Sequence, residues 1–211
     1  MAKVKTTRKL WFRGIKKFLG LIIKKPEFIF LGGSMDDLNK QMLFITNHVA
    51  ASAPLTLELY GPHPFRYWGT FEMNSNLITV YKYLSYTYYH KKKHWNLTAA
   101  RLFCLIAAPL VSLFYRGLQL ISTYPDIRLL QTIRESAKVI KENQSLVIFP
   151  EHSVDGYHDE LTFFHSGFLL MAEKCLKMGY DLPMYLAYLR KSDRKYIIDK
   201  PIKLSELLST G

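Results

Sequence analysis

The sequence predicts an α/β fold, in which helices flank a mostly parallel central sheet and an N-terminal amphipathic helix precedes it. Two observations predict this fold. Short apolar runs bounded by Gly, Pro or Asn alternate with segments of helical periodicity along most of the chain. The 211 residues are 49% hydrophobic and 22% charged, which is enough apolar material for a packed domain and excludes an intrinsically disordered chain.

Several short apolar runs are expected to form the strands of the sheet. The first run ends at Gly32 and the fourth ends at Pro150, and both residue types interrupt strands. The expected strands are 28–31, 41–46, 65–68, 146–149, 183–189 and 195–199.

Helical periodicity is clearest in residues 126–143, where Asp126 is a favourable N-cap. A second helix is expected over 166–179, with Gly179 as its stop. After Asn47 we expect a loop and then a helix that has Pro54 in its first turn. This order of strands and helices is typical of a parallel sheet.

Polar side chains follow two of the expected strands. Asn47 and His48 come directly after the second strand, and Pro150 and Glu151 come after the strand 146–149. Ligands of parallel sheets bind beyond the carboxyl ends of the strands. The sequence therefore places a binding site where these two segments meet.

Residues 102–115 form the longest apolar run, with Ser112 as their one polar residue. The run is shorter than the roughly 18 residues that a membrane span needs, so a polytopic membrane protein is not expected. We expect a buried core helix kinked at Pro109; the alternative is a helix that dips into a membrane or lines an acyl chain. Residues 81–95, rich in Tyr and Lys, suit the headgroup level of a membrane or stacking on single-stranded bases.

The charge of the chain is concentrated at its N-terminus. The formal net charge is +12, and residues 1–25 contain nine Lys or Arg and no acidic residue. We interpret residues 1–27 as a membrane-anchoring segment whose helix lies in the plane of an anionic bilayer. The alternative is a core-packing helix with a solvated basic face. The apolar face would present Trp11, Phe12, Ile15 and Phe18, and the basic face Lys9, Arg13, Lys16 and Lys17.

The chain shows no motif for a metal or a nucleotide cofactor. Cys104 and Cys175 are the two cysteines and have no zinc or disulfide spacing, so a reducing compartment is expected. His90 and His94 lack a third metal ligand nearby. No glycine-rich phosphate loop of the Walker or dinucleotide type occurs.

Four segments in order resemble the glycerolipid acyltransferase family of bacterial 1-acyl-glycerol-3-phosphate acyltransferases. They are Asn47-His48, the Phe-Pro-Glu-His-Ser of 149–153, the Phe-His-Ser-Gly of 164–167 and the Asp-Leu-Pro-Met of 181–184. The resemblance extends over residues 28–200, so we take 28–205 as an acyltransferase-like domain.

The resemblance implies an O-acyltransferase of phospholipid biosynthesis at the cytoplasmic face of the cell membrane, bound peripherally or monotopically. His48 and Glu151 would be catalytic, with His48 as the general base. Acyl-CoA or an acyl carrier protein would donate the acyl chain, a lysophospholipid would accept it, and no cofactor would be needed. The implied substrate-binding residues are Asn47, Ser52, Phe149, Pro150, His152, Ser153, Arg116 and Arg128.

The sequence departs from the family pattern at three places. Ala53 occupies the position of the motif's Asp, and His152 replaces a Gly. No Arg occurs inside 117–126, the stretch aligned with the second motif, although Arg116 and Arg128 flank it. Three acids are candidates to replace the missing carboxylate, whereas Ser52 offers only a neutral hydrogen bond. They are Glu58, Asp155 and Asp159.

Two other functions fit parts of the sequence. A non-catalytic lipid-binding homologue fits the loss of the acid at Ala53. A nucleic-acid-binding protein fits the charge of +12, but residues 26–211 hold 20 basic and 17 acidic side chains, which argues against nucleic acid as a partner.

Overall fold

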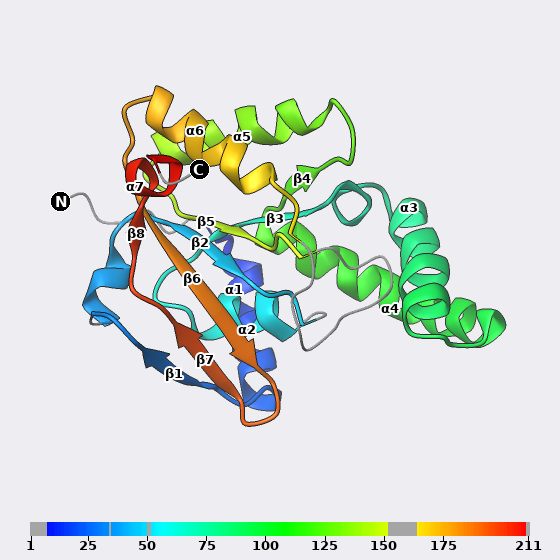
Figure 1. Ribbon diagram of the computed structural model, residues 1–211. Helices are drawn as coiled ribbons and strands as arrows, with labels where there is room; N and C mark the ends of the chain where they lie inside the picture. The colour runs from blue at the N-terminus through cyan, green and yellow to red at the C-terminus, as the bar shows by residue number, and fades with distance from the viewer. Residues whose placement is uncertain (1–7, 34, 50–51, 152–163, 210–211) are drawn as a thin grey trace.

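The computed structural model describes residues 8–33, 35–49, 52–151 and 164–209, and within them eight strands form one sheet (Figure 1). The strand order is β1-β7-β6-β2-β5-β3-β4, with β8 paired to β6. The strands are β1 (Glu27–Phe30), β2 (Leu43–Thr46), β3 (Arg66–Thr70), β4 (Ile121–Thr123), β5 (Leu146–Ile148), β6 (Pro183–Arg190), β7 (Lys195–Ile198) and β8 (Ile202–Lys203).

The sheet is mostly parallel, which confirms the predicted fold class. β2 pairs in parallel with both β5 and β6, β3 pairs in parallel with β4 and β5, and β1 pairs in parallel with β7. Among the named strands that the structure describes, the two antiparallel pairs both involve β6, which pairs with β7 and with β8. The carboxyl ends of β2 and β5 therefore meet at one edge of the sheet, as expected for a binding site.

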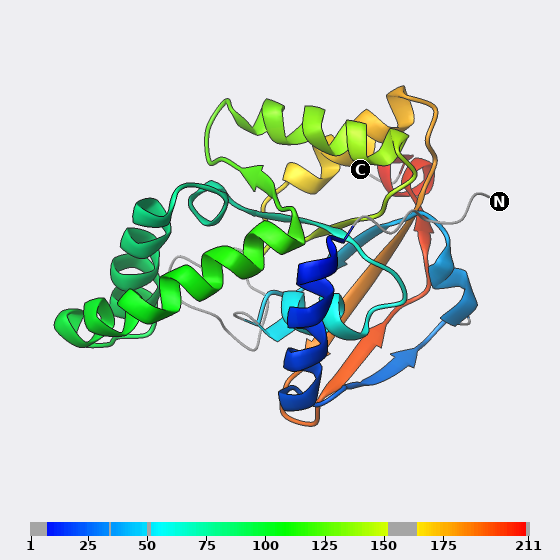
Figure 2. The same cartoon turned by 180° about the vertical axis from the view of Figure 1, so that it is seen from behind.

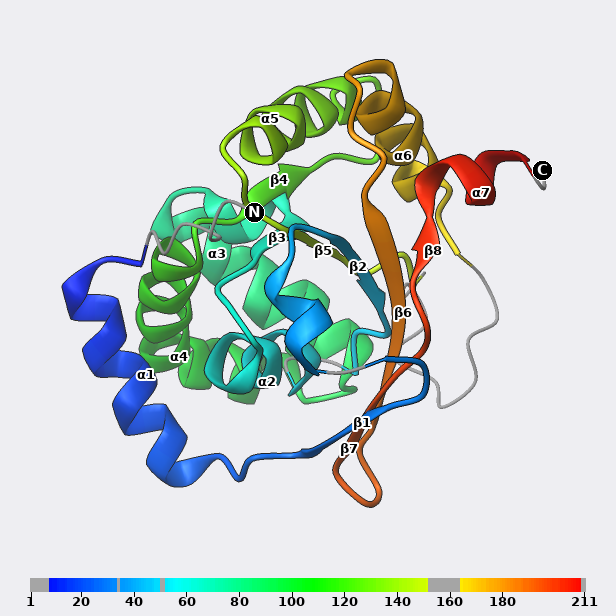
Figure 3. The ribbon, with the colours of Figure 1, turned by 90° about the vertical axis from the view of Figure 1, so that its left-hand side faces the viewer.

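Helices cover both faces of the sheet (Figures 2 and 3), and alternate residues of each strand face opposite layers. Leu43 and Ile45 belong to the core on the side of α5, α6 and α7, whereas Phe44 belongs to the core beneath α1, α2 and α4. The helices are α1 (Leu10–Ile22), α2 (Ser52–Tyr60), α3 (Leu77–Lys82), α4 (Leu97–Leu118), α5 (Leu129–Lys141), α6 (Gly167–Lys177) and α7 (Leu204–Ser209), with 3₁₀ turns η1 (Met35–Asn39) and η2 (Phe71–Asn74) and a π-helix η3 (Tyr83–Lys92).

The N-terminal helix α1 forms as predicted, and it packs into the body of the domain. Phe12 is fully buried, and its ring lies 5.4 Å from that of Phe114 on α4. A Cβ on Gly117 would lie only 2.0 Å from the Phe12 ring, so the two helices meet here in direct contact. Helix α1 therefore packs as part of the α/β domain.

A buried cluster of charges ties the same segment to α2. The Glu58 side chain is 0% exposed and accepts hydrogen bonds from Arg8 Nε at 3.0 Å and Arg8 Nη2 at 2.8 Å. Lys16 Nζ lies 2.9 Å from the same carboxylate, so Lys16, which the sequence assigns to the basic face, is ion-paired with α2. Arg8 also donates to the backbone oxygens of Phe65 and Leu118, so four of its five N–H donors are used in the interior.

The expectation of a buried core helix over 102–115 is wrong. α4 is one helix of 22 residues, and only 28% of its most apolar window is buried. It is long and apolar enough to cross a membrane by length and composition alone. Counting only the uninterrupted apolar run missed it, because Arg101 and Arg116 lie within the helix near its two ends. The helix also continues through Pro109.

Candidate active site

The structure brings together the two segments that the sequence placed at one edge of the sheet. His48 lies two residues beyond β2 and Glu151 lies three residues beyond β5, and these strands are parallel neighbours. The backbone N–H of His48 donates a hydrogen bond to Oε2 of Glu151 at 2.8 Å. Glu151 thus fixes the backbone on which the imidazole is mounted.

The side chain of Asn47 holds the turn that follows β2 against the neighbouring strand β6. Its Nδ2 donates to the backbone oxygen of Leu189 on β6 at 3.1 Å, and its Oδ1 accepts from the N–H of Leu189 at 2.8 Å. The side chain extends the pairing of β2 with β6 by imitating a peptide group, and the residue is only 5% exposed. Its amide therefore holds the turn that carries His48.

The residue after His48 has a strained backbone. Val49 has φ of 38°, in the left-handed region that β-branched residues rarely adopt. Such outliers persist where the surrounding structure enforces them, and they are common at functional turns. The two residues before Val49 are held in place, Asn47 by its bonds to Leu189 and His48 by its bond to Glu151.

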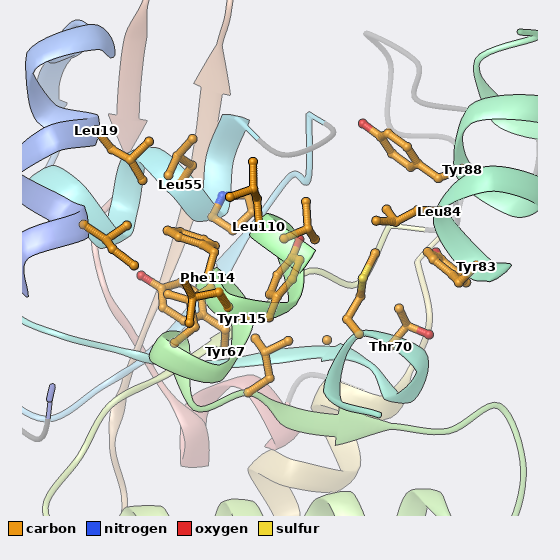
Figure 4. Close-up of a pocket in the computed structure, with 18 of the residues that line it drawn as sticks. Leu19, Leu55, Tyr67, Thr70, Tyr83, Leu84, Tyr88, Leu110, Phe114 and Tyr115 are labelled. Carbon is orange, nitrogen blue, oxygen red and sulfur yellow. The ribbon is translucent and has the colours of Figure 1, made fainter. Parts of the chain in front are cut away.

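The His48 ring forms part of the wall of an apolar cavity of about 730 Å³. Figure 4 shows other residues of this wall, among them Leu19, Leu55 and Tyr67. It packs edge-on against Phe149 at 4.8 Å, and Phe149 stacks parallel to Tyr67 at 6.5 Å. Among the described residues that line the cavity, none is Asp, Glu, Lys or Arg. The other lining residues come from α1, α2, β3, η3 and α4 and include Leu19, Leu55, Leu84, Leu110, Phe114 and Tyr115.

The tyrosines in the wall are neutral at any physiological pH. Burial, with the charge of Glu58 adding to it, raises the pKa of Tyr67 well above its usual range. Burial raises the pKa of Tyr83 and of Tyr115 to about 12. These side chains present an apolar ring and an uncharged hydroxyl, so the cavity suits a hydrocarbon chain with few polar groups.

The other motif residues lie around this edge. Ser52 opens α2, and Ala53 is 0% exposed in the core beneath that helix. Pro150 accepts a hydrogen bond from the N–H of His165 at 2.8 Å, and Glu151 forms an antiparallel bridge with Phe164. The start of the Phe-Pro-Glu-His-Ser segment and the Phe-His-Ser-Gly stretch of 164–167 are therefore neighbours in space. His152, Ser153, Asp155 and Asp159 lie outside the described residues.

Neither arginine that flanks the second motif lines the cavity. Arg116 is exposed in the last turn of α4. Arg128 donates to both oxygens of Asp126 and stacks on Tyr124, with its guanidinium carbon 4.6 Å from the ring centroid. The hydrogen bonds between the two side chains, and with them the ion pair, lower the pKa of Asp126 and raise that of Arg128.

Sequence reasoning missed Tyr67 and the aromatic residues of η3 as parts of the site. The signal for Tyr67 was available, because alternation within the strand 65–68 places it and Phe65 on one face. In the parts of the chain that the structure describes, no group of three or more His, Cys, Asp or Glu could hold a metal ion.

No protein-family model matches this chain, and no curated protein matches it in sequence. Among solved structures, the chain is similar to the crystal structure of the 1-acyl-sn-glycerophosphate (LPA) acyltransferase, PlsC, from Thermotoga maritima. The two share 13% sequence identity with a TM-score of 0.49, over 94% of this chain and 74% of that one.

Proposed function

We propose that this protein is an O-acyltransferase that moves a fatty acyl chain from a thioester to the hydroxyl of a lysophospholipid-like acceptor. The observation that carries the proposal is the imidazole of His48 in the wall of an uncharged, apolar cavity at the carboxyl ends of β2 and β5. The resemblance of the sequence motifs makes 1-acyl-glycerol-3-phosphate the first acceptor to test.

The cavity supports the binding of an acyl chain. Its volume of about 730 Å³ lies in the range of sites that enclose small ligands. Each methylene transferred from water into such a lining contributes roughly 0.8 kcal/mol. A long acyl chain would therefore anchor the substrate and leave its carbonyl carbon beside His48.

The proposed chemistry is a single acyl transfer. His48 takes the proton of the acceptor hydroxyl as its oxygen attacks the thioester carbonyl. The C–O bond forms, the C–S bond breaks, and the proton passes from the imidazolium to the thiolate of coenzyme A or acyl carrier protein. Glu151 acts by holding the His48 backbone, and Arg116 or Arg128 remains the proposed contact for an acceptor phosphate.

Ala53 provides no carboxylate to orient His48, which lowers the expected rate of transfer but does not prevent transfer. Glu58 is committed to Arg8 and Lys16, so it is not a free replacement. A thioester is more activated than an amide, so a base without an orienting carboxylate can still assist transfer.

We further propose that α1 holds the protein on an anionic cytoplasmic membrane surface. Its outer face exposes Leu10, Trp11 and Phe18, and Lys9, Arg13 and Lys17 are also exposed. Each Lys or Arg near an anionic surface contributes about 1 kcal/mol. The buried Phe12 and the ion-paired Lys16 face the body instead.

Mass-spectrometric detection of product tests the proposed transfer. The purified protein is given acyl-CoA or acyl carrier protein thioester with lysophosphatidate, in parallel with His48→Ala and His94→Asn. His94 is exposed at φ 56°, a conformation that Asn tolerates, and it does not line the cavity. We expect product from the parent and His94→Asn, and a loss of roughly 10²- to 10⁴-fold in His48→Ala. Equal turnover in all three would remove His48 from the mechanism.

A non-catalytic lipid-binding protein is the second candidate, favoured by the buried Ala53. It predicts stoichiometric binding of a lysophospholipid or fatty acid without release of thiol from any thioester. Acceptor-dependent thiol release would exclude it.

A further inference from the structure

Acidic residues are missing from a second long part of the chain. Residues 74–125 contain no Asp or Glu, and neither do residues 1–25. All 17 acidic residues lie in the rest of the chain. This second stretch includes α3, η3 and α4, which we call the helical hairpin. Its basic residues are Lys82, Lys91, Lys92, Lys93, Arg101 and Arg116.

The helical hairpin projects from the body of the domain (Figures 1 and 2). Its inner side is packed, since Val80, Leu84 and Cys104 belong to the core. Its outer side exposes large apolar side chains on α4. Leu102 is 64% exposed, and Ile106 is 73% exposed.

Aromatic residues and cations gather at the tip of the helical hairpin. Tyr89, Trp95 and Phe103 pack on one another with ring centroids 4.8 to 5.4 Å apart. The ammonium of Lys91 lies 4.9 Å from the ring centroid of Tyr86. Tyr, Trp and Lys with exposed apolar neighbours are the composition of the headgroup level of a bilayer.

The cavity opens onto the same apolar surface. Phe18 on α1 and Leu110 and Leu113 on α4 line the cavity, yet they are 62%, 63% and 45% exposed. They therefore form a rim that is continuous with the outer side of α4.

We propose that the outer side of the helical hairpin, through Leu102, Leu105, Ile106 and Leu110, seats in an anionic lipid bilayer, with the mouth of the cavity facing the membrane. Charge favours a bilayer over a second copy of this chain. Two copies would bring acid-free cationic surfaces together, whereas anionic headgroups neutralise them. This contact is separate from that of α1, and it does not depend on the protein being an enzyme.

A single-site fluorescent label tests the seating directly. A polarity-sensitive dye is attached to Ile106→Cys, and in a matched protein to Ile127→Cys, which is 80% exposed ahead of α5. Both native cysteines, Cys104 and Cys175, are fully buried and protected from labelling. With vesicles of phosphatidylcholine and phosphatidylglycerol, the dye at 106 should shift to the blue and be quenched by lipids that carry quenchers on their chains. The dye at 127 should not change.

Three results would overturn the proposal. In the first, the protein binds vesicles while the dye at 106 stays in water, which would leave α1 as the sole contact. In the second, the dye at 106 becomes shielded without lipid as protein concentration rises, which would make this surface an interface between copies. In the third, the protein does not bind the vesicles at all.

A pair of double variants gives a second measurement. Leu105→Gln with Ile106→Gln should weaken partitioning into the anionic vesicles roughly tenfold or more, because both apolar side chains are then lost from the contact. Ile127→Gln with Leu130→Gln, at residues 80% and 50% exposed, should leave partitioning unchanged. Equal loss in both pairs, or none in either, would contradict the seating of α4.

Discussion

Glu58 shows how one side chain ties the N-terminal segment to the domain. Its carboxylate is fully buried and shared between Arg8 and Lys16, so it cannot be removed without leaving cations uncompensated in the interior. We predict that Glu58→Gln lowers the free energy of unfolding by about 3–5 kcal/mol. Glu173→Gln breaks an exposed pair with Lys177 and should cost no more than about 1 kcal/mol.

Urea unfolding followed by circular dichroism measures both free energies. A Glu58→Gln protein as stable as Glu173→Gln would mean that the buried ions contribute nothing beyond an ordinary surface pair.

The sequence predicted the meeting of His48 and Glu151, because parallel strands fix where their carboxyl ends lie. It could not predict the partners of Glu58 or of Lys16. Those contacts join residues 42 and more positions apart through helix packing, for which a single sequence has no local pattern. Asn47 was placed at the site correctly, but its bonds to Leu189 depend on the pairing of β2 with β6.

The contact of α1 with α4 depends on the absence of a side chain at Gly117. An added Cβ would lie 2.0 Å from the ring of Phe12, which is fully buried and has no room to move. We predict that Gly117→Ala destabilises the protein by roughly 1–3 kcal/mol, in spite of the better helix propensity of Ala. Gly20→Ala on α1 should be neutral or stabilising, since its Cβ would meet only Tyr60 Oη at 3.9 Å.

Thermal unfolding at matched concentrations compares the two glycine variants. Equal melting temperatures would show that α1 does not dock on α4 in the way described.

Strand positions could be predicted from short apolar runs, and β1, β2, β5, β6 and β7 lie where those runs are. The short strand β4 was not predicted because two of its three residues, Ser122 and Thr123, are polar and interrupt any apolar run. The burial of α4 could not be predicted from its apolar composition. A helix that leaves its apolar side exposed can be as apolar as one that is buried in the core. The wide turns of η3 have no sequence signature that separates them from an ordinary helix.

The distribution of charge links the fold to the proposed function. The two acid-free segments, residues 1–25 and 74–125, are distant in sequence, yet α1 and α4 pack together beside the cavity. Composition alone identified the first segment. The second became clear only when the structure placed its exposed apolar residues at the rim of the cavity.

The central claim is that the cavity beside His48 holds the acyl chain that is transferred. Gly14 lines this cavity, and a Cβ there would have nothing within 4 Å, so a larger side chain can occupy the space without disturbing the fold. Gly20 lies on the same helix but does not line the cavity, which makes Gly20→Leu the matched control.

The decisive measurement is the rate of acyl transfer as a function of acyl chain length for the parent protein, Gly14→Leu and Gly20→Leu. We predict that Gly14→Leu moves the optimum to shorter chains because the new side chain fills part of the cavity, while Gly20→Leu keeps the parent optimum. An unchanged optimum in Gly14→Leu, or no transfer by the parent at any chain length, would contradict the claim.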